Sequence, residues 1–136
     1  MSQNTTIIPA LRYVDAPGAI EWLCTAFGLE RHLVVPGPEN TITHAQLSFG
    51  TGMIMLGSAK QGDFDKMLRQ PAETDGQVTQ TIYMVVEDVD GHCARARAAG
   101  AKITMEPEDQ DYGGRLYTCR DLEGHVWSFG SYDPWA

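Results

Sequence analysis

The sequence contains two similar halves, and this internal repeat limits the folds that the chain can adopt. Asp15-Ala-Pro-Gly18 matches Asp88-Val-Asp-Gly91 at an offset of 73 residues (88 − 15), and Gly28 matches Gly100 at an offset of 72 (100 − 28). The loss of one residue within the second helix accounts for the change in offset. A repeat of this length, present only twice, is not a solenoid and predicts a duplicated half-domain.

Each half shows the same order of predicted elements: a strand, a helix and three more strands. In the first half Asp15 is a good helix N-cap, Pro17 suits the first turn and Gly28 is a helix stop. The predicted strands there are 6–13, 29–35, 41–49 and 53–56. In the second half the predicted helix is 89–99 and the predicted strands are 79–86, 101–105, 115–120 and 125–129.

The two halves are predicted to form one α+β domain. Module one covers about residues 6–57 and module two about residues 79–131. The intervening connector, about residues 58–78, has no clear period, although a helical turn is expected at 64–69. Two like units whose sheets curve together would leave a cleft at their junction, where binding sites commonly lie.

The last predicted strand separates large aromatic residues from small polar ones. Successive side chains of a strand point to opposite faces, so His125, Trp127 and Phe129 share one face, and Val126 and Ser128 share the other. Two aromatic residues on one face favour a covering helix, and His125 is therefore interpreted as structural. The opposite face is predicted to line a hollow.

Charge and composition narrow the classes of partner. The chain has 10 basic and 18 acidic residues, a formal net charge of −8, which argues against nucleic acid and favours a cationic small molecule or simple solubility. The sequence contains no apolar run of about 18 residues, so no membrane span is predicted. The first residues lack a signal-peptide pattern, and the three scattered cysteines suit free thiols in a reducing cytoplasm.

Several motifs give the chain a family resemblance. They are Ile8-Pro-Ala-Leu-Arg-Tyr13, Ala19-Ile-Glu-Trp22, Tyr112-Gly-Gly-Arg115 and Arg120-Asp-Leu-Glu-Gly-His-Val-Trp127. With the repeat, they make the chain resemble the vicinal oxygen chelate superfamily of glyoxalase I, ring-cleaving dioxygenases and bleomycin-resistance proteins. The uncharacterised glyoxalase/bleomycin-resistance-like branch is especially similar. The resemblance implies two tandem βαβββ modules that form a curved mixed sheet around a cleft.

The same resemblance implies one His or Glu metal ligand on each of four strands in the metal enzymes of the family. Carried over by motif, those positions are Ile8, Gln46, Thr81 and Ser128. Divalent first-row metals need imidazole, carboxylate or thiolate donors, and none of the four positions supplies one. The prediction is therefore no metal and no cofactor. A shift of the alignment toward His44 or His125 remains the alternative.

The four positions still indicate which face lines the cavity. The predicted ligand-binding residues are His44, Gln46, Thr81, Tyr83, Tyr112, Arg115 and Ser128. Arg12, Ser48 and Thr118 are expected on the same face. Alternative interpretations remain: His44 facing solvent, Tyr83 packed in the core, a simple loop at 112–115, or polar side chains that bond only to one another.

Three functions are compatible with this pattern. The favoured one is a metal-free small-molecule-binding protein, with the cleft shared between the subunits of a homodimer. The second is a lyase, isomerase or dioxygenase of the same superfamily, either metal-dependent or using His44 or Tyr83 as acid or base. The third is a protein-interaction domain that presents Tyr132 and Trp135.

Overall fold

A computed structural model describes residues 4–136; residues 1–3, which begin the segment without a signal-peptide pattern, lie outside the described part. The elements in chain order are β1 (Ala10–Tyr13), α1 (Ala16–Phe27), β2 (Glu30–Pro36), β3 (Ile42–Phe49), β4 (Gly52–Ser58), the 3₁₀ turns η1 (Asp65–Met67) and η2 (Pro71–Thr74), β5 (Ile82–Val85), α2 (Val89–Ala98), β6 (Lys102–Asp109), β7 (Arg115–Arg120) and β8 (Val126–Gly130).

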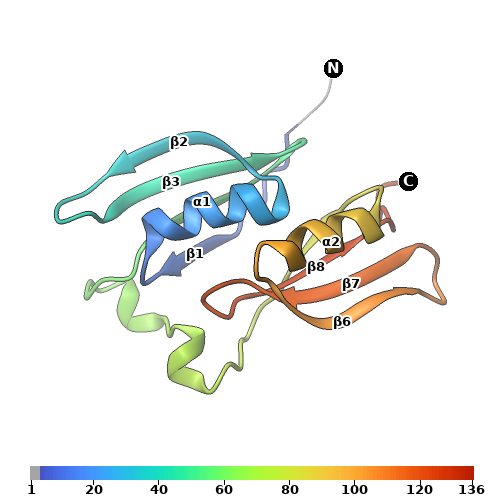
Figure 1. Cartoon of the computed structure of the whole chain (residues 1–136). Helices are drawn as coiled ribbons and strands as arrows, with labels where there is room; N and C mark the ends of the chain where they lie inside the picture. The colour runs from blue at the N-terminus through green and yellow to red at the C-terminus, as the bar shows by residue number, and fades with distance from the viewer. Residues whose placement is uncertain (1–3) are drawn as a thin grey trace.

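The eight strands form two four-stranded sheets with the same topology (Figure 1). The strand orders are β1-β4-β3-β2 and β5-β8-β7-β6. In each sheet the first strand pairs in parallel with the fourth, and the remaining pairs are antiparallel. The predicted α+β fold with two tandem βαβββ units is therefore confirmed. The strands divide into two sheets rather than one continuous sheet, because β1 and β5 are both edge strands.

The two helices begin with the same local structure. Asp15 accepts a hydrogen bond from the backbone N of Gly18 at 3.2 Å, and Asp88 accepts one from the backbone N of Gly91 at 3.0 Å. A Cβ on either glycine would collide with the capping carboxylate, so glycine at the third position after the cap leaves room for the carboxylate to bond there. The repeat seen in the sequence thus corresponds to a repeated helix cap.

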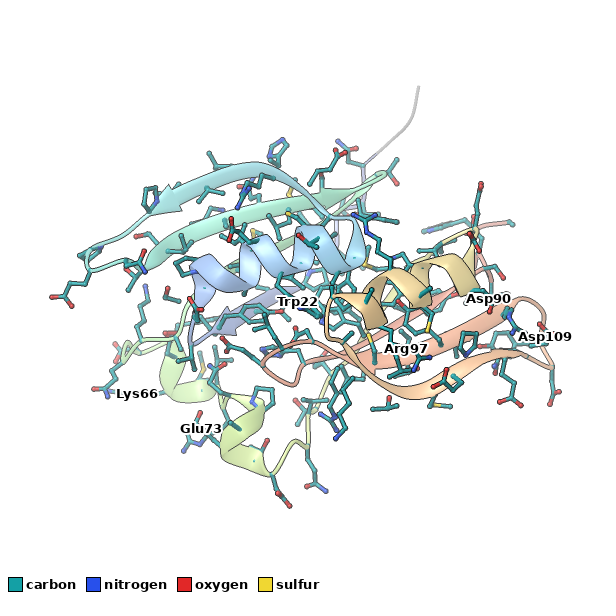
Figure 2. All side chains as sticks on the ribbon, viewed as in Figure 1. Trp22, Lys66, Glu73, Asp90, Arg97 and Asp109 are labelled. Atoms are coloured by element: carbon teal, nitrogen blue, oxygen red, sulfur yellow. The ribbon has the colours of Figure 1, made fainter. Side chains whose placement is uncertain are left out.

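The helices pack against each other, and one core runs through both halves of the molecule. Trp127 and Phe129 are fully buried, with ring centroids 5.1 and 4.7 Å from that of Phe27 in α1. Trp22, which points from α1 toward α2 in Figure 2, donates from Nε1 to the carbonyl of Ala99 at 2.8 Å. The prediction that a helix covers the aromatic face of the last strand is confirmed.

Element boundaries differ from the predictions mainly at the sheet edges. The strand predicted at 101–105 extends to Asp109, through Pro107. Proline and charged residues are compatible with β6 because it is an edge strand, whose outer backbone groups need no partner. The strand predicted at 6–13 is regular only from Ala10, and that at 79–86 only over β5. The helical turn predicted at 64–69 appears as η1, and η2 follows it.

Within residues 4–136, none of the helices combines the length and the apolar character that crossing a membrane requires.

Candidate functional site

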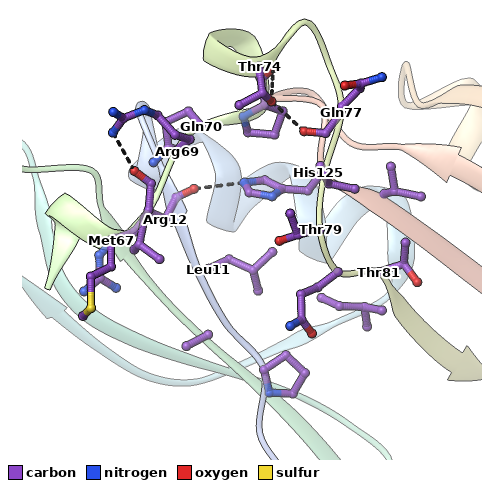
Figure 3. Close-up of a pocket in the computed structure, with 18 of the residues that line it drawn as sticks. Leu11, Arg12, Met67, Arg69, Gln70, Thr74, Gln77, Thr79, Thr81 and His125 are labelled. Atoms are coloured by element: carbon purple, nitrogen blue, oxygen red, sulfur yellow. Dashed lines mark hydrogen bonds between the residues drawn. The ribbon is translucent and has the colours of Figure 1, made fainter.

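An open groove of about 660 Å³ lies between the two sheets (Figure 3). One wall is the chain from Ile7 to Arg12, and the other is the segment from Gln77 to Ile82 that leads into β5. The connector contributes a third side, from Met67 to Pro71, and His125 and Val126 complete the lining. The groove thus uses parts of both modules and of the connector between them.

Unpaired strand edges create the groove. The carbonyls of Pro9, just before β1, and of Tyr13 accept hydrogen bonds from Met55 N and Ala59 N, each at 2.9 Å, so these residues turn their backbone groups toward β4. Ladder bonds alternate along a strand, and the backbone groups of Ala10 and Arg12 therefore point away from β4. His125 Nε2 donates to the carbonyl of Arg12 at 3.0 Å and fills one of these positions.

Arg12 is held in the groove wall by the connector. Its Nε donates to Oδ1 of Asp65 at 3.0 Å, and the two side chains are only 20% and 6% exposed. The guanidinium carbon lies 5.2 Å from the ring centroid of Phe64, within cation–π distance. Oδ2 of Asp65 is buried and has no hydrogen-bond partner within the part of the chain that the structure describes. The ion pair therefore anchors η1 to the first strand.

The turn from Asp121 to Gly124 fixes the position of His125. Asp121 is buried and accepts four hydrogen bonds: from Tyr13 OH at 2.6 Å, Trp127 Nε1 at 3.0 Å, Glu123 N at 2.9 Å and His125 N at 3.1 Å. The His125 ring also packs edge-on against Tyr13, with centroids 4.8 Å apart. These contacts give His125 the structural role expected for it, although its ring also lines the groove.

Two of the predicted site residues lie on the first sheet, outside the groove. Gln46 accepts from His44 Nε2 through Oε1 and donates to His32 Nδ1 through Nε2, both at 2.9 Å. This polar chain runs across β2 and β3 on the sheet face opposite α1, because buried Ala45 and Leu47 occupy the helix side. Both polar atoms of the Gln46 amide thus bond to imidazoles, and His32 is a neighbour that the sequence reasoning did not name.

The predicted residues of the second sheet are divided among different surroundings. Thr81 lines the groove between the sheets. Tyr83 lines a second hollow of about 510 Å³ beside the C-terminal segment, and its hydroxyl donates to the carbonyl of Tyr132 at 2.6 Å. The hydroxyls of Ser128 and Thr118 bond to each other at 2.8 Å on the exposed sheet face. The single chain therefore does not gather these residues in one cavity.

The loop at 112–115 is engaged with the C-terminal segment. The rings of Tyr112 and Tyr132 meet edge to face, with centroids 5.2 Å apart. Gly114 has a φ of 76°, and a Cβ there would lie 2.7 Å from the backbone N of Tyr132, so both conformation and space require glycine. Arg115 bonds to Asp90 and Asp109, each at 3.1 Å. Its guanidinium is committed to these carboxylates.

The four positions that the resemblance assigns to metal ligands do not fit a metal. Ile8 carries no donor, Thr81 and Ser128 carry neutral hydroxyls, and the amide of Gln46 is held by two histidines. Among residues 4–136, no three His, Cys, Asp or Glu side chains are grouped so that they could hold an ion. Neutral hydroxyls and an amide are poor ligands for zinc, nickel or iron.

Burial keeps two thiols and one phenol of the chain in their protonated forms. Burial raises the pKa of the Cys119 thiol to about 12 and also raises that of Cys93. Burial likewise raises the pKa of the Tyr83 hydroxyl above its ordinary value of 10.0. The thiolate and phenolate forms that would attack or abstract a proton are therefore disfavoured at neutral pH.

Sequence reasoning missed the connector's contribution to the groove. Its members there include Met67, Arg69 and Gln70, which precede η2. Their stretch has neither helical nor strand periodicity, so nothing local indicated which face they present. The sequence feature that could have indicated a binding surface here was composition, because this stretch combines apolar side chains with an arginine.

Comparisons with known proteins agree with this architecture. Residues 7–129 match the family model of the Glyoxalase/Bleomycin resistance protein/Dioxygenase superfamily. The uncharacterised protein Mb0911c of Mycobacterium bovis is 34% identical over 125 residues, which span 90% of this chain and 80% of that protein.

Solved structures show the same fold. The crystal structure of TioX from Micromonospora sp. ML1 has a TM-score of 0.72 and 33% identity, covering 93% of this chain and 94% of TioX. The fosfomycin resistance protein FosX from Listeria monocytogenes, solved with Mn(II) and a sulfate ion, has a TM-score of 0.67, covering 98% of this chain and 96% of FosX. At 12% identity FosX shows the fold alone. The chain belongs to the glyoxalase/bleomycin resistance protein/dioxygenase superfamily.

Proposed function

We propose that the protein binds a small molecule, without a metal ion, in the groove between its two sheets. The observation that carries the proposal is the groove itself, in which apolar and polar side chains of both modules and the connector converge. Its volume of about 660 Å³ falls within the usual range for ligand sites. The donor set at the four family positions supports binding without a metal.

A thermal-shift screen tests the proposal. A ligand that binds only the folded state stabilises it by about 2.7 kcal/mol at about 100 times its dissociation constant, which raises the melting temperature by several degrees. Thr81→Val keeps the side-chain shape and removes a hydroxyl from the groove, so it should reduce the shift. Thr25→Val, on the exposed side of α1, is the matched control and should leave the shift intact.

Elemental analysis of tag-free protein tests the metal-free part of the proposal. Well under one equivalent of zinc, nickel, iron or manganese per chain is expected, because the four family positions lack suitable donors. About one equivalent per chain that disappears in His44→Ala or His125→Ala would show that one of these histidines is a ligand.

Recovery of the bound compound separates binding from catalysis. A binding protein returns the compound unchanged, whereas the enzyme alternative, a lyase, isomerase or dioxygenase, converts it. The raised pKa of the Tyr83 hydroxyl disfavours its use as a base, which is one of the routes open to the enzyme alternative.

A protein-interaction role is the second candidate, and the C-terminal segment supports it. Trp135 is 92% exposed and lies beside the hollow that also contains Tyr83. An indole so exposed is typical of a side chain that becomes buried in an interface. Trp135→Ala should leave small-molecule binding intact if the two functions are separate, and a binding isotherm measures this.

A further inference from the structure

The groove between the sheets differs in charge from the rest of the molecule. The whole chain has 18 acidic and 10 basic residues, yet among the described residues that line the groove there is no aspartate or glutamate. Two arginines, Arg12 and Arg69, do line it. Asp65 offsets the charge of Arg12, so Arg69 gives the groove its net positive charge, and such a groove in a strongly acidic protein favours an anionic occupant over a cationic one.

The guanidinium of Arg12, a groove-lining residue, keeps hydrogen-bond donors for such an occupant. Nε is used by Asp65, whose side chain is only 6% exposed. The Nη1 and Nη2 atoms make no hydrogen bond to the described residues. A Cβ built on Gly57 would lie 3.6 Å from Nη1, so the guanidinium rests close to bare backbone. Paired Nη donors match the two oxygens of a carboxylate.

The surroundings of Arg12 hold its guanidinium in one orientation and shield it partly from water. The Phe64 ring covers the guanidinium, whose side chain is 20% exposed, and the ion pair with Asp65 sets its direction. A preorganised cation that is shielded from water binds an anion more strongly than a mobile surface arginine. Arg69, on the connector, adds a second and more exposed cation to the same groove.

The rest of the lining defines the body of the ligand. Leu11, Met67 and Val126 supply apolar surface, and Thr79 and Thr81 supply neutral hydroxyls, as Figure 3 shows for four of them. We infer that the groove recognises a small organic carboxylate with an apolar body, its carboxylate on Arg12 and Arg69. This inference rests on the proposed function and names its class of ligand. It replaces the cationic ligand that net charge alone favours.

Matched sets of compounds test the inference by calorimetry on the full chain. Each set has one aromatic or aliphatic core that carries a carboxylate, a carboxamide or an aminomethyl group. The carboxylate member should bind about tenfold or more tightly than its carboxamide, since a charged hydrogen bond exceeds a neutral one by roughly that factor. Its affinity should decrease when the salt concentration is raised from about 0.05 M to about 0.5 M, because the screening length becomes shorter.

Variants of the two arginines locate the charge. Arg69→Gln should weaken binding of the carboxylate compound about tenfold and leave the affinity for the carboxamide compound unchanged. Arg31→Gln, an exposed arginine of β2 away from the groove, makes the same change in net charge and should alter neither affinity. Arg12→Gln alone leaves Asp65 buried without its partner, so Arg12→Gln is combined with Asp65→Asn, and this double variant should also lose the preference for the carboxylate.

The outcomes separate the two proposals. Binding of all three members of a set with equal affinity, or tighter binding of the aminomethyl member, overturns the carboxylate inference and leaves the binding function standing. A carboxylate preference that survives in both the Arg69 variant and the double variant also overturns it. Failure of every compound in every set to bind contradicts the proposed function itself.

Discussion

Asp121 accepts four hydrogen bonds, two of them from buried aromatic side chains, and the one from Tyr13 links the two modules. Tyr13 OH belongs to the first module and Trp127 Nε1 to the second, and both donate to Oδ2. Removing the carboxylate leaves two buried donors without acceptors, each costing about 1–3 kcal/mol. Asp121→Ala should therefore lower the free energy of unfolding by about 2–6 kcal/mol in urea titrations. Asp111→Ala, an exposed aspartate, is the control and should change stability by less than about 0.5 kcal/mol.

His92 should make stability depend on pH. Its Nε2 donates to the carbonyl of Phe27 at 2.9 Å, and in the neutral ring its Nδ1 accepts from Tyr117 OH at 2.6 Å. Burial, and to a lesser extent Arg95, lower the pKa of His92 from 6.5. Below about pH 6.5 the unfolded chain then binds more protons than the folded one. This contribution is present above that pH and is lost as pH falls toward the lowered folded pKa.

Urea titrations at about pH 7.5 and about pH 5.5 measure this effect. The wild type should be less stable at the lower pH, and His92→Gln should lose part of that difference. His44→Gln, on the exposed face of the first sheet, should retain it. An unchanged pH dependence in His92→Gln would show that other groups control acid stability.

At the scale of the elements, the repeated helix caps should carry similar energies in both modules. Asp15 and Asp88 each accept from the backbone of a glycine three residues later. Replacing an N-cap carboxylate by alanine costs about 0.5–2 kcal/mol, so Asp15→Ala and Asp88→Ala should destabilise to a similar extent. Glu21→Ala, on the exposed middle of α1, is the control. A cost confined to one of the two caps would show that the modules are not energetically equivalent.

The elements also show what the sequence can predict. Asp15, Gly28 and the 3.6-residue spacing are local signals, and they placed both helices within one or two residues. Trp127 and Phe129 were placed on the correct face by strand alternation alone. The extension of β6 was not predictable in this way, because strand pairing with β7 overrides the poor propensity of Pro107.

The candidate site was less predictable than the fold. Alternation indicated the faces of His44, Gln46 and Ser128, but not which faces meet in space. The groove depends on the path of an aperiodic connector and on an ion pair between residues 12 and 65, which are 53 positions apart. Such contacts follow from tertiary packing, and no local pattern encodes them.

At the scale of the whole molecule, both sheets leave one face open. Leu33 and Val35 of β2 lie opposite Gln46 and His44 in register, so they share the exposed face of the first sheet. In the second sheet Tyr83 pairs with Ser128 and Met105 with Thr118, and these side chains again share one face. The exposed apolar side chains on these faces are Leu33, Val35, Tyr83, Val85 and Met105.

Exposed apolar side chains on an ordered sheet face are typical of a covered interface, and homodimers are the commonest oligomers. We therefore expect a homodimer, with a light-scattering mass near twice 15.0 kDa at micromolar concentration. Leu33→Lys introduces a charge on this face and should shift the mass toward the monomer. Val14→Lys changes an even more exposed apolar residue in the loop before α1 and should leave the dimer intact. A wild-type mass near 15.0 kDa would contradict the dimer and would leave His44, Gln46 and Ser128 on an open surface, since no second copy would then enclose them.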